Sequence, residues 1–119
     1  MLKTEAEIII GKLHSSDNYR EFLDGSSRVY ECLNSAAIGL GTYLPGWRWS
    51  THAGAQTGKP SERHIGYIIS GKFIIQSPSG EEKLVGPGDA FEMGPNHDAW
   101  VVGDEPSVAL DFTHIEQQQ

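Results

Sequence analysis

Short runs of alternating apolar and polar residues fill most of the chain from residue 27 onward, and Gly, Pro, Asn or Ser separates successive runs. Side chains on a strand alternate between two faces, so this pattern predicts half-buried β-strands joined by tight turns. The expected strands are 28–33, 37–44, 47–52, 65–69, 72–76, 81–85, 90–93, 97–102 and 107–112. Many short strands with little helix predict an all-β sandwich or barrel of antiparallel strands.

The N-terminal part has a different pattern. Segment 7–13 contains three consecutive isoleucines and predicts a strand or an arm laid across another surface. Segment 15–23 combines Ser, Asp and Asn cap candidates with apolar residues at helix-like spacing, which predicts one or two helical turns. We therefore expect an arm and short helix over 1–35, packed on the barrel or on a partner subunit, a barrel over 36–113 and a frayed tail over 114–119.

Length and charge narrow the class of protein. A chain of 119 residues is expected to form one domain with a core that needs neither disulfides nor a structural metal. The formal net charge is -7 and Lys and Arg are not clustered, which argues against a nucleic-acid partner. No run approaches the ~20 apolar residues needed to cross a bilayer, and the first residues are acidic where a signal peptide is basic. We expect a cytoplasmic protein that binds neither nucleic acid nor membranes.

The single cysteine, Cys32, cannot form an internal disulfide bond. A lone cysteine fits a reducing compartment, and its strand-like neighbours predict a small buried apolar residue rather than a nucleophile.

Five strings of residues resemble the cupin superfamily. They are 67–71 (Tyr-Ile-Ile-Ser-Gly), 86–89 (Gly-Pro-Gly-Asp), 93–97 (Met-Gly-Pro-Asn-His), 45–52 (Pro-Gly-Trp-Arg-Trp-Ser-Thr-His) and 97–106 (His-Asp-Ala-Trp-Val-Val-Gly-Asp-Glu-Pro). The two longer strings are similar to a group of small single-domain cupins, many without an assigned function. The resemblance implies a jelly-roll barrel, or double-stranded β-helix, of two facing sheets.

The resemblance also implies a metal site that can be carried over residue by residue. The first histidine place of the cupin motif is matched by His52, whereas the second is occupied by Gly54. The usual glutamate place falls on His64, and the later histidine place falls on Ala99, two residues after His97. Because residues two apart on a strand share a face, His52, His64 and His97 are the expected metal ligands. Three imidazoles with open positions suit Zn, Fe, Ni or Cu; without a metal, the same histidines would line a polar pocket.

Strand parity assigns the residues around His52. Arg48 and Ser50 share its face and are candidate substrate-binding residues, although Arg48 could instead pair with an acid at the barrel mouth. Trp47 and Trp49 have the opposite parity and are expected to face away from the pocket.

Three further residues on or near these strands have candidate roles. Trp100 is also expected to face away from the pocket, by the same parity rule. Glu62 and Asp98 are candidates either for acceptors that fix the imidazole tautomers or for solvated loop charges.

Two functions remain open from these residues. The first is a small-molecule-binding cupin with a mononuclear metal site, acting as a dioxygenase or isomerase. The second is a non-catalytic, metal-free cupin that serves as a ligand-binding or sensor module. One fold hosts many chemistries, so the resemblance does not separate the two. The resemblance and the apolar N-terminal arm together imply a homodimer.

Overall fold

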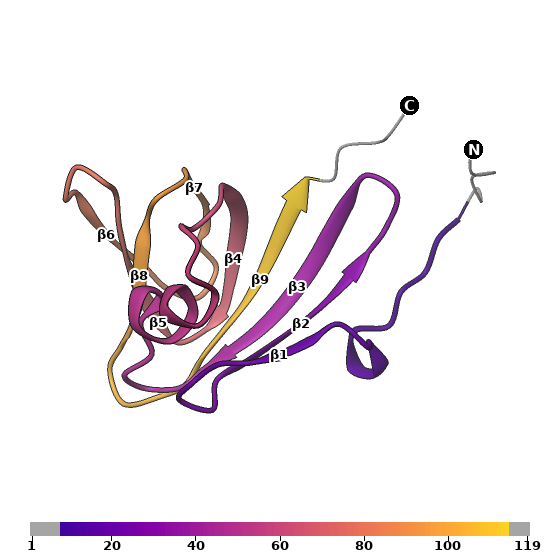
Figure 1. Cartoon of the computed structure of the whole chain (residues 1–119), viewed down its shortest axis with the longest axis horizontal. Coiled ribbons are helices and arrows are strands. Elements are labelled where there is room, and N and C mark those ends of the chain that lie inside the picture. The colour runs from indigo at the N-terminus through magenta and orange to yellow at the C-terminus, as the bar shows by residue number, and fades with distance from the viewer. Residues whose placement is uncertain (1–7, 115–119) are drawn as a thin grey trace.

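Two antiparallel sheets make up the computed structural model, which describes residues 8–114 (Figure 1). The six-stranded sheet has the order β1 (Tyr19–Glu21), β2 (Ser27–Cys32), β3 (Ala36–Tyr43), β9 (Ser107–His114), β4 (His64–Ser70) and β7 (Ala90–Met93). The three-stranded sheet has the order β6 (Glu82–Val85), β5 (Lys72–Gln76) and β8 (Asp98–Val102). The predicted all-β architecture of antiparallel strands is confirmed.

The turns between strands lie where the sequence places glycine. Gly71, between β4 and β5, has a φ of 75°, and a Cβ at this position would lie 2.5 Å from the Cα of Ser107. A left-handed backbone and a close approach to β9 therefore both require glycine here. This is the physical reason that the predicted strand boundaries on either side of this turn agree with the structure to within a residue or two.

The predicted helix over 15–23 is wrong. A single 3-10 turn, η1 (Leu13–Ser15), precedes β1, and the Ser16 hydroxyl donates to the Tyr30 carbonyl at 2.6 Å. Residues 16–21 therefore make their hydrogen bonds to β2, and they do not form a helix. Because β2 pairs with β3 along its whole length, the sheet extends across the domain boundary proposed at residue 36.

The expectations for the N-terminal arm, the C-terminal tail and Cys32 compare with the structure as follows. Residues 8–12 form no strand, and the rest of the predicted arm and the tail after residue 114 lie outside the described residues. Cys32, expected to be buried, is exposed at the end of β2.

The predicted strand over 47–52 is also wrong, because its second half is helical. A π-helical segment, η2 (Trp49–Gly54), runs directly into α1 (Ala55–Thr57). A Cβ at Gly54 would lie 2.5 Å from the Trp49 ring, so glycine allows the indole to pack across the segment. No helix within residues 8–114 is long and apolar enough to cross a membrane.

The core between the sheets is dominated by aromatic side chains. Trp47, only 4% exposed, packs against Tyr43 with ring centroids 4.5 Å apart, and Phe22 and Phe73 complete the cluster. Burial of each such side chain contributes roughly 1.5–3 kcal/mol. The prediction that Trp47 faces outward is therefore wrong, and Trp49, which packs on the core, also departs from it.

Candidate functional site

A cavity of about 470 Å³ lies between the sheets, within the size range of small-molecule sites. It exists because the inward positions of β3 carry small residues: Ala37, Gly39 and Gly41 are buried and precede the larger Tyr43. Ala109 on β9 also lines it. Large side chains at these positions would fill the interior of a small barrel.

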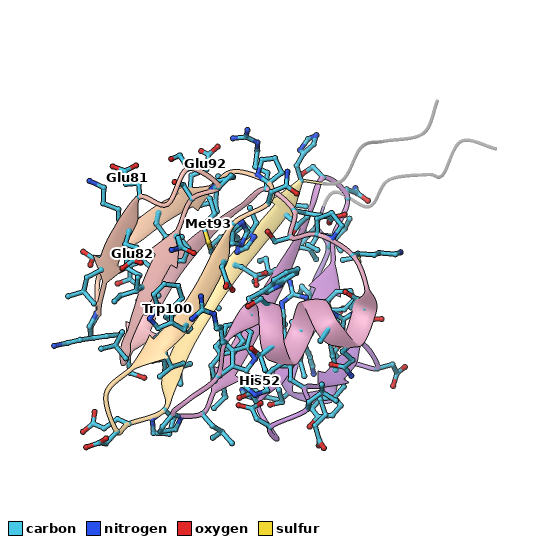
Figure 2. All side chains as sticks on the ribbon, turned by 60° about the vertical axis from the view of Figure 1, so that its left-hand side comes forward. His52, Glu81, Glu82, Glu92, Met93 and Trp100 are labelled. Carbon is cyan, nitrogen blue, oxygen red and sulfur yellow. The ribbon has the colours of Figure 1, made fainter. Side chains whose placement is uncertain are left out.

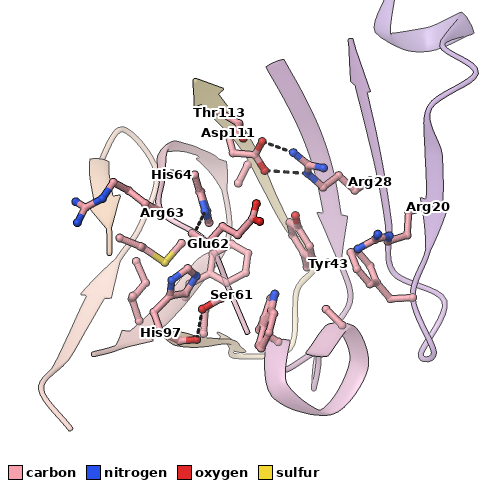
Figure 3. Close-up of a pocket in the computed structure, with 18 of the residues that line it drawn as sticks. Arg20, Arg28, Tyr43, Ser61, Glu62, Arg63, His64, His97, Asp111 and Thr113 are labelled. Carbon is pink, nitrogen blue, oxygen red and sulfur yellow. Dashed lines mark hydrogen bonds and ion pairs between the residues drawn. The ribbon is translucent and has the colours of Figure 1, made fainter. Parts of the chain in front are cut away.

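One wall of the cavity holds an ion pair over a glycine. Arg28 on β2 donates from Nε and Nη2 to the two carboxylate oxygens of Asp111 on β9, at 2.9 and 2.6 Å (Figure 3). A Cβ at Gly39, on the strand between them, would lie 2.5 Å from Asp111 Oδ1 and 2.6 Å from Arg28 Nη2. Burial alone would lower the pKa of Arg28, but the hydrogen bond and charge of Asp111 outweigh it and raise that pKa. The guanidinium therefore stays charged.

A further donor belongs to the same wall. The Tyr43 hydroxyl lies over the next inward glycine, since a Cβ at Gly41 would clash with it. Burial raises the pKa of Tyr43 far above its ordinary value, so the hydroxyl keeps its proton. The indole Nε1–H of Trp47 is buried and has no hydrogen-bond partner within residues 8–114.

The facing wall carries a pair of histidines. The rings of His64, at the start of β4, and His97, just before β8, have centroids 5.3 Å apart (Figure 3). Nδ1 of His97 donates to the Gly94 carbonyl at 2.7 Å, and Nδ1 of His64 donates to the Glu62 carbonyl at 3.2 Å. A carbonyl oxygen only accepts hydrogen bonds, so these contacts place the proton of each neutral ring on Nδ1 and leave a lone pair on Nε2.

His97 is held in its neutral form. Burial lowers its pKa, and the neighbouring His64 lowers it further, against the opposing effect of the Gly94 carbonyl. The buried Ser61 hydroxyl donates to the His97 carbonyl at 2.8 Å and fixes the backbone that carries the ring.

His52 does not join this pair. It is absent from the cavity lining, and its Nδ1 accepts the backbone N–H of Arg48 at 3.0 Å. Figure 2 shows His52 at the base of the helical segment, away from Met93, which lines the cavity. The three-histidine arrangement predicted from strand parity is therefore not formed, because the helix turns the His52 side chain to a different direction. Within residues 8–114, no three His, Cys, Asp or Glu side chains are grouped as a metal site requires.

Arg48 and Ser50 also lie outside the cavity, which corrects their predicted role in substrate binding. Arg48 Nε donates to Asp98 Oδ2 at 2.9 Å, and its guanidinium lies 4.3 Å from the centre of the Trp100 ring. Ser50 donates to Asp98 from both its backbone N–H and its hydroxyl. The alternative pairing of Arg48 with an acid is thus the one observed, and Asp98 anchors the helical segment rather than an imidazole.

Three residues of the wall that carries the ion pair were missed by sequence reasoning: Arg28, Tyr43 and Asp111. The two glycines at positions 39 and 41, both inward on one strand, are the one local signal of close approach there. Nothing local links Arg28 to Asp111, because 83 residues separate them.

Solved structures similar to this chain include proteins named as cupins. KdgF from Halomonas sp. has a TM-score of 0.62 and 20% identity, with 83% of this chain and 88% of that chain covered. A sugar phosphate isomerase from a cupin superfamily of Silicibacter pomeroyi has a TM-score of 0.63 and 16% identity over 88% and 74% of the two chains. An RmlC-like cupin from Shewanella frigidimarina has a TM-score of 0.61 and 13% identity over 96% and 95%.

No protein-family model matches the chain, and no curated protein matches it. The similar structures nevertheless show that this protein has the cupin fold, a small jelly-roll barrel. The fold expected from the turn and strand strings is confirmed.

Proposed function

We propose that the protein binds a small organic molecule in the cavity between its sheets. The observation that carries this proposal is the pair of imidazoles, His64 and His97, whose Nδ1 atoms are fixed by carbonyl oxygens beside a cavity of about 470 Å³. Pockets with a largely apolar lining and a few convergent polar groups are typical of ligand sites. A fixed imidazole lone pair is also a general base, which supports proton-transfer chemistry such as isomerisation.

A mononuclear metal site is a second candidate, favoured by the same two rings. Hydrogen bonding of Nδ1 to a carbonyl is how proteins orient histidines that bind a metal through Nε2. The described residues supply two such nitrogens and no third ligand, so other positions would be completed by water or by the bound molecule. A bound Zn, Fe, Ni or Cu ion would supply a Lewis acid that polarises an oxygen of the substrate.

The metal proposal is tested by metal analysis of protein purified from unsupplemented medium and again after loading with each ion. We expect His64→Ala and His97→Ala to lose bound metal and His52→Ala to retain it, because His52 bonds the Arg48 backbone instead. Metal content that is unchanged in all three variants would remove the metal site and leave the ligand-binding proposal standing.

The ligand-binding proposal is tested with a chemically diverse library screened by native mass spectrometry and thermal shift. Ala109→Leu adds bulk to the cavity lining, whereas Val108→Leu adds it at the neighbouring position of β9, outside the cavity lining. We expect compounds that bind the unmodified chain to bind Val108→Leu and to lose affinity for Ala109→Leu. Equal binding to both variants, or no binding from any class of compound, would contradict the proposal.

We also propose that the outer face of the six-stranded sheet binds a second copy of the chain. Strand register places five apolar or aromatic residues in one row across it: Tyr19, Val29, Leu40, Leu110 and Tyr67. Directly paired residues in antiparallel strands share a face, so the row is continuous. Tyr19 is 57% exposed and Tyr67 is 41% exposed, which is a large aromatic surface for an unpartnered sheet.

The neighbouring row extends this face. Ile38, Phe112 and Ile65 are paired across three strands, with Glu31 at one end of the row and Glu92 at the other. An apolar centre with charges at its rim is the composition of a protein interface. The chain's own isoleucine segment borders this face, since a Cβ at Gly11 would lie 2.8 Å from Glu31 Oε2, and it adds Ile8 and Ile10, 78% and 79% exposed, to the apolar surface that a second copy would cover.

A further inference from the structure

The two walls of the cavity have opposite hydrogen-bonding character, and this deepens the ligand-binding proposal on which it rests. Arg28 commits Nε and Nη2 to Asp111, leaving Nη1 outside the pair. The Tyr43 hydroxyl belongs to the same wall and keeps its proton, because burial raises the pKa of Tyr43. Both groups can donate hydrogen bonds to a ligand in the cavity. This wall therefore favours an acceptor group on the ligand.

The charge of the lining favours an anion as that acceptor group. Four of the chain's nine basic residues line the cavity, against two of its sixteen acidic residues. This balance is opposite in sign to the net charge of -7 on the whole chain. A guanidinium recognises a carboxylate through parallel hydrogen bonds, which makes a carboxylate the best match to the free edge of Arg28.

The opposite wall accepts hydrogen bonds. Nδ1 of His64 and Nδ1 of His97 each donate to a backbone carbonyl, so the tautomer that these bonds favour presents Nε2 as an acceptor. Figure 3 shows these two rings on one side of the cavity, with Arg28 and Tyr43 on the other side. A ligand that spans the two walls therefore needs an acceptor at one end and a donor, such as a hydroxyl group, at the other.

The surfaces between the walls are aromatic. Rings of Phe22, Trp47, Trp49, Phe73 and Phe91 line the cavity together with aliphatic side chains. Offset and edge-to-face contacts with such rings favour a planar aromatic ligand over a polyhydroxylated one, whose remaining hydroxyl groups would lack partners.

Glu62 limits the ligand to one carboxylate. Its side chain lines the cavity and lies between the two walls in Figure 3. A second carboxylate at the histidine end would meet this negative charge, and the neighbouring Arg63 (Figure 3) is already paired with Glu92 at 2.9 Å.

We infer that the cavity takes a hydroxylated aromatic monocarboxylate, with its carboxylate on Arg28 and Tyr43 and its hydroxyl donating to Nε2 of His64 or His97. A single ring of this kind fits comfortably within about 470 Å³. Each wall of the cavity thus binds a different end of the ligand.

The inference is tested by titrating tryptophan fluorescence and by calorimetry with the three hydroxybenzoates, 4-hydroxycinnamate, benzoate, 4-hydroxybenzyl alcohol and glucuronate. We expect at least one hydroxylated aromatic carboxylate to bind about tenfold more tightly than benzoate, 4-hydroxybenzyl alcohol or glucuronate, because each of these lacks one recognised feature. A preference for glucuronate, or equal binding of benzoate and the hydroxybenzoates, would overturn it.

Substitutions in one wall at a time test which end of the ligand each wall binds. Tyr43→Phe removes one hydroxyl from the donor wall and should weaken benzoate and the best hydroxybenzoate by similar factors, with no effect on 4-hydroxybenzyl alcohol. His64→Ala and His97→Ala together should abolish the tenfold advantage of the hydroxybenzoate and leave benzoate unchanged. If the folded variants lose affinity for these ligands in any other pattern, the assignment of the two walls is wrong.

Failure of this inference differs from failure of the ligand-binding proposal. If another class of compound binds and loses affinity in Ala109→Leu, the cavity is a ligand site and only the assigned class is wrong. If no compound of any class binds, both are wrong.

Discussion

Gly39 illustrates how one residue without a side chain builds the cavity wall. It lies on the inward face of β3, and the bidentate pair between Arg28 and Asp111 occupies the space that a Cβ would need. Both partners are largely shielded, with side chains 25% and 15% exposed. Breaking such a pair leaves charged groups with fewer hydrogen bonds than they have in water, which costs more than the pair contributes.

We expect Gly39→Ala to destabilise the protein by roughly 1–3 kcal/mol, because the added methyl group overlaps Asp111 Oδ1 and displaces the ion pair. Urea unfolding at pH 7 measures this change. Gly86→Ala is the matched control, since a Cβ there meets only Lys72 Cγ at 3.6 Å. Equal midpoints for the two variants would show that the guanidinium and carboxylate move aside at little cost.

At the scale of one element, the helical segment η2 depends on a partner from another strand. Asp98, at the start of β8, accepts hydrogen bonds from the Ser50 N–H, the Ser50 hydroxyl and Arg48 Nε. These bonds hold the first turn of the helix against the sheet. Burial by itself would raise the pKa of Asp98, but the hydrogen bonds from Ser50, Ala99 and Arg48 outweigh it and lower that pKa.

A lowered pKa predicts a definite dependence of stability on pH. The folded chain binds a proton at Asp98 less readily than the unfolded chain, whose aspartates titrate near pH 3.9, so the stabilisation is present above about pH 4 and lost as pH falls. We expect Asp98→Asn to be about 1–3 kcal/mol less stable at pH 7 and to approach the unmodified chain at pH 3. Urea titrations at a series of pH values measure both.

Asp104→Asn provides the control for this series, because Asp104 is exposed in the turn before β9. Its stability should follow that of the unmodified chain at every pH. A constant gap between Asp98→Asn and the unmodified chain from pH 7 to pH 3 would contradict the role given to the Asp98 charge.

At the scale of the whole molecule, the outer face of the six-stranded sheet is the surface that we propose binds a second copy of the chain. Ile65 is 50% exposed and Phe112 is 36% exposed, next to the row that ends at Tyr67. Neighbouring exposed apolar side chains on one face of a sheet are typical of a protein interface.

We expect the purified chain to be a dimer, and Tyr67→Lys combined with Phe112→Lys to convert it to a monomer, because two buried lysines would carry unbalanced charge into the interface. Sedimentation velocity over a hundredfold range of concentration measures this. Leu84→Lys is the control: Leu84 is 61% exposed on β6 of the other sheet and should leave the dimer intact. A monomer for the unmodified chain would remove the proposal.

The predictions from sequence agree with the structure where an element depends on residues close to it in the chain. The strands 65–69, 72–76 and 90–93 were predicted to within about a residue, because alternation and turn residues act locally. The strand over 47–52 was not, since Arg48, Trp49 and Ser50 alternate like a strand but are held as the start of a helix by Asp98. The parity argument for His52 failed with it.

The sequence by itself determined the all-β class, the turns and the placement of His64 and His97 on inward positions, because each depends on neighbours a few residues away. Only the tertiary structure decided that His52 bonds the Arg48 backbone and that Arg28, Tyr43 and Asp111 form the opposite wall. Those relations join residues from strands far apart in the chain, and their geometry depends on sheet register and on the direction of a helix. A pattern of polar and apolar residues carries neither quantity.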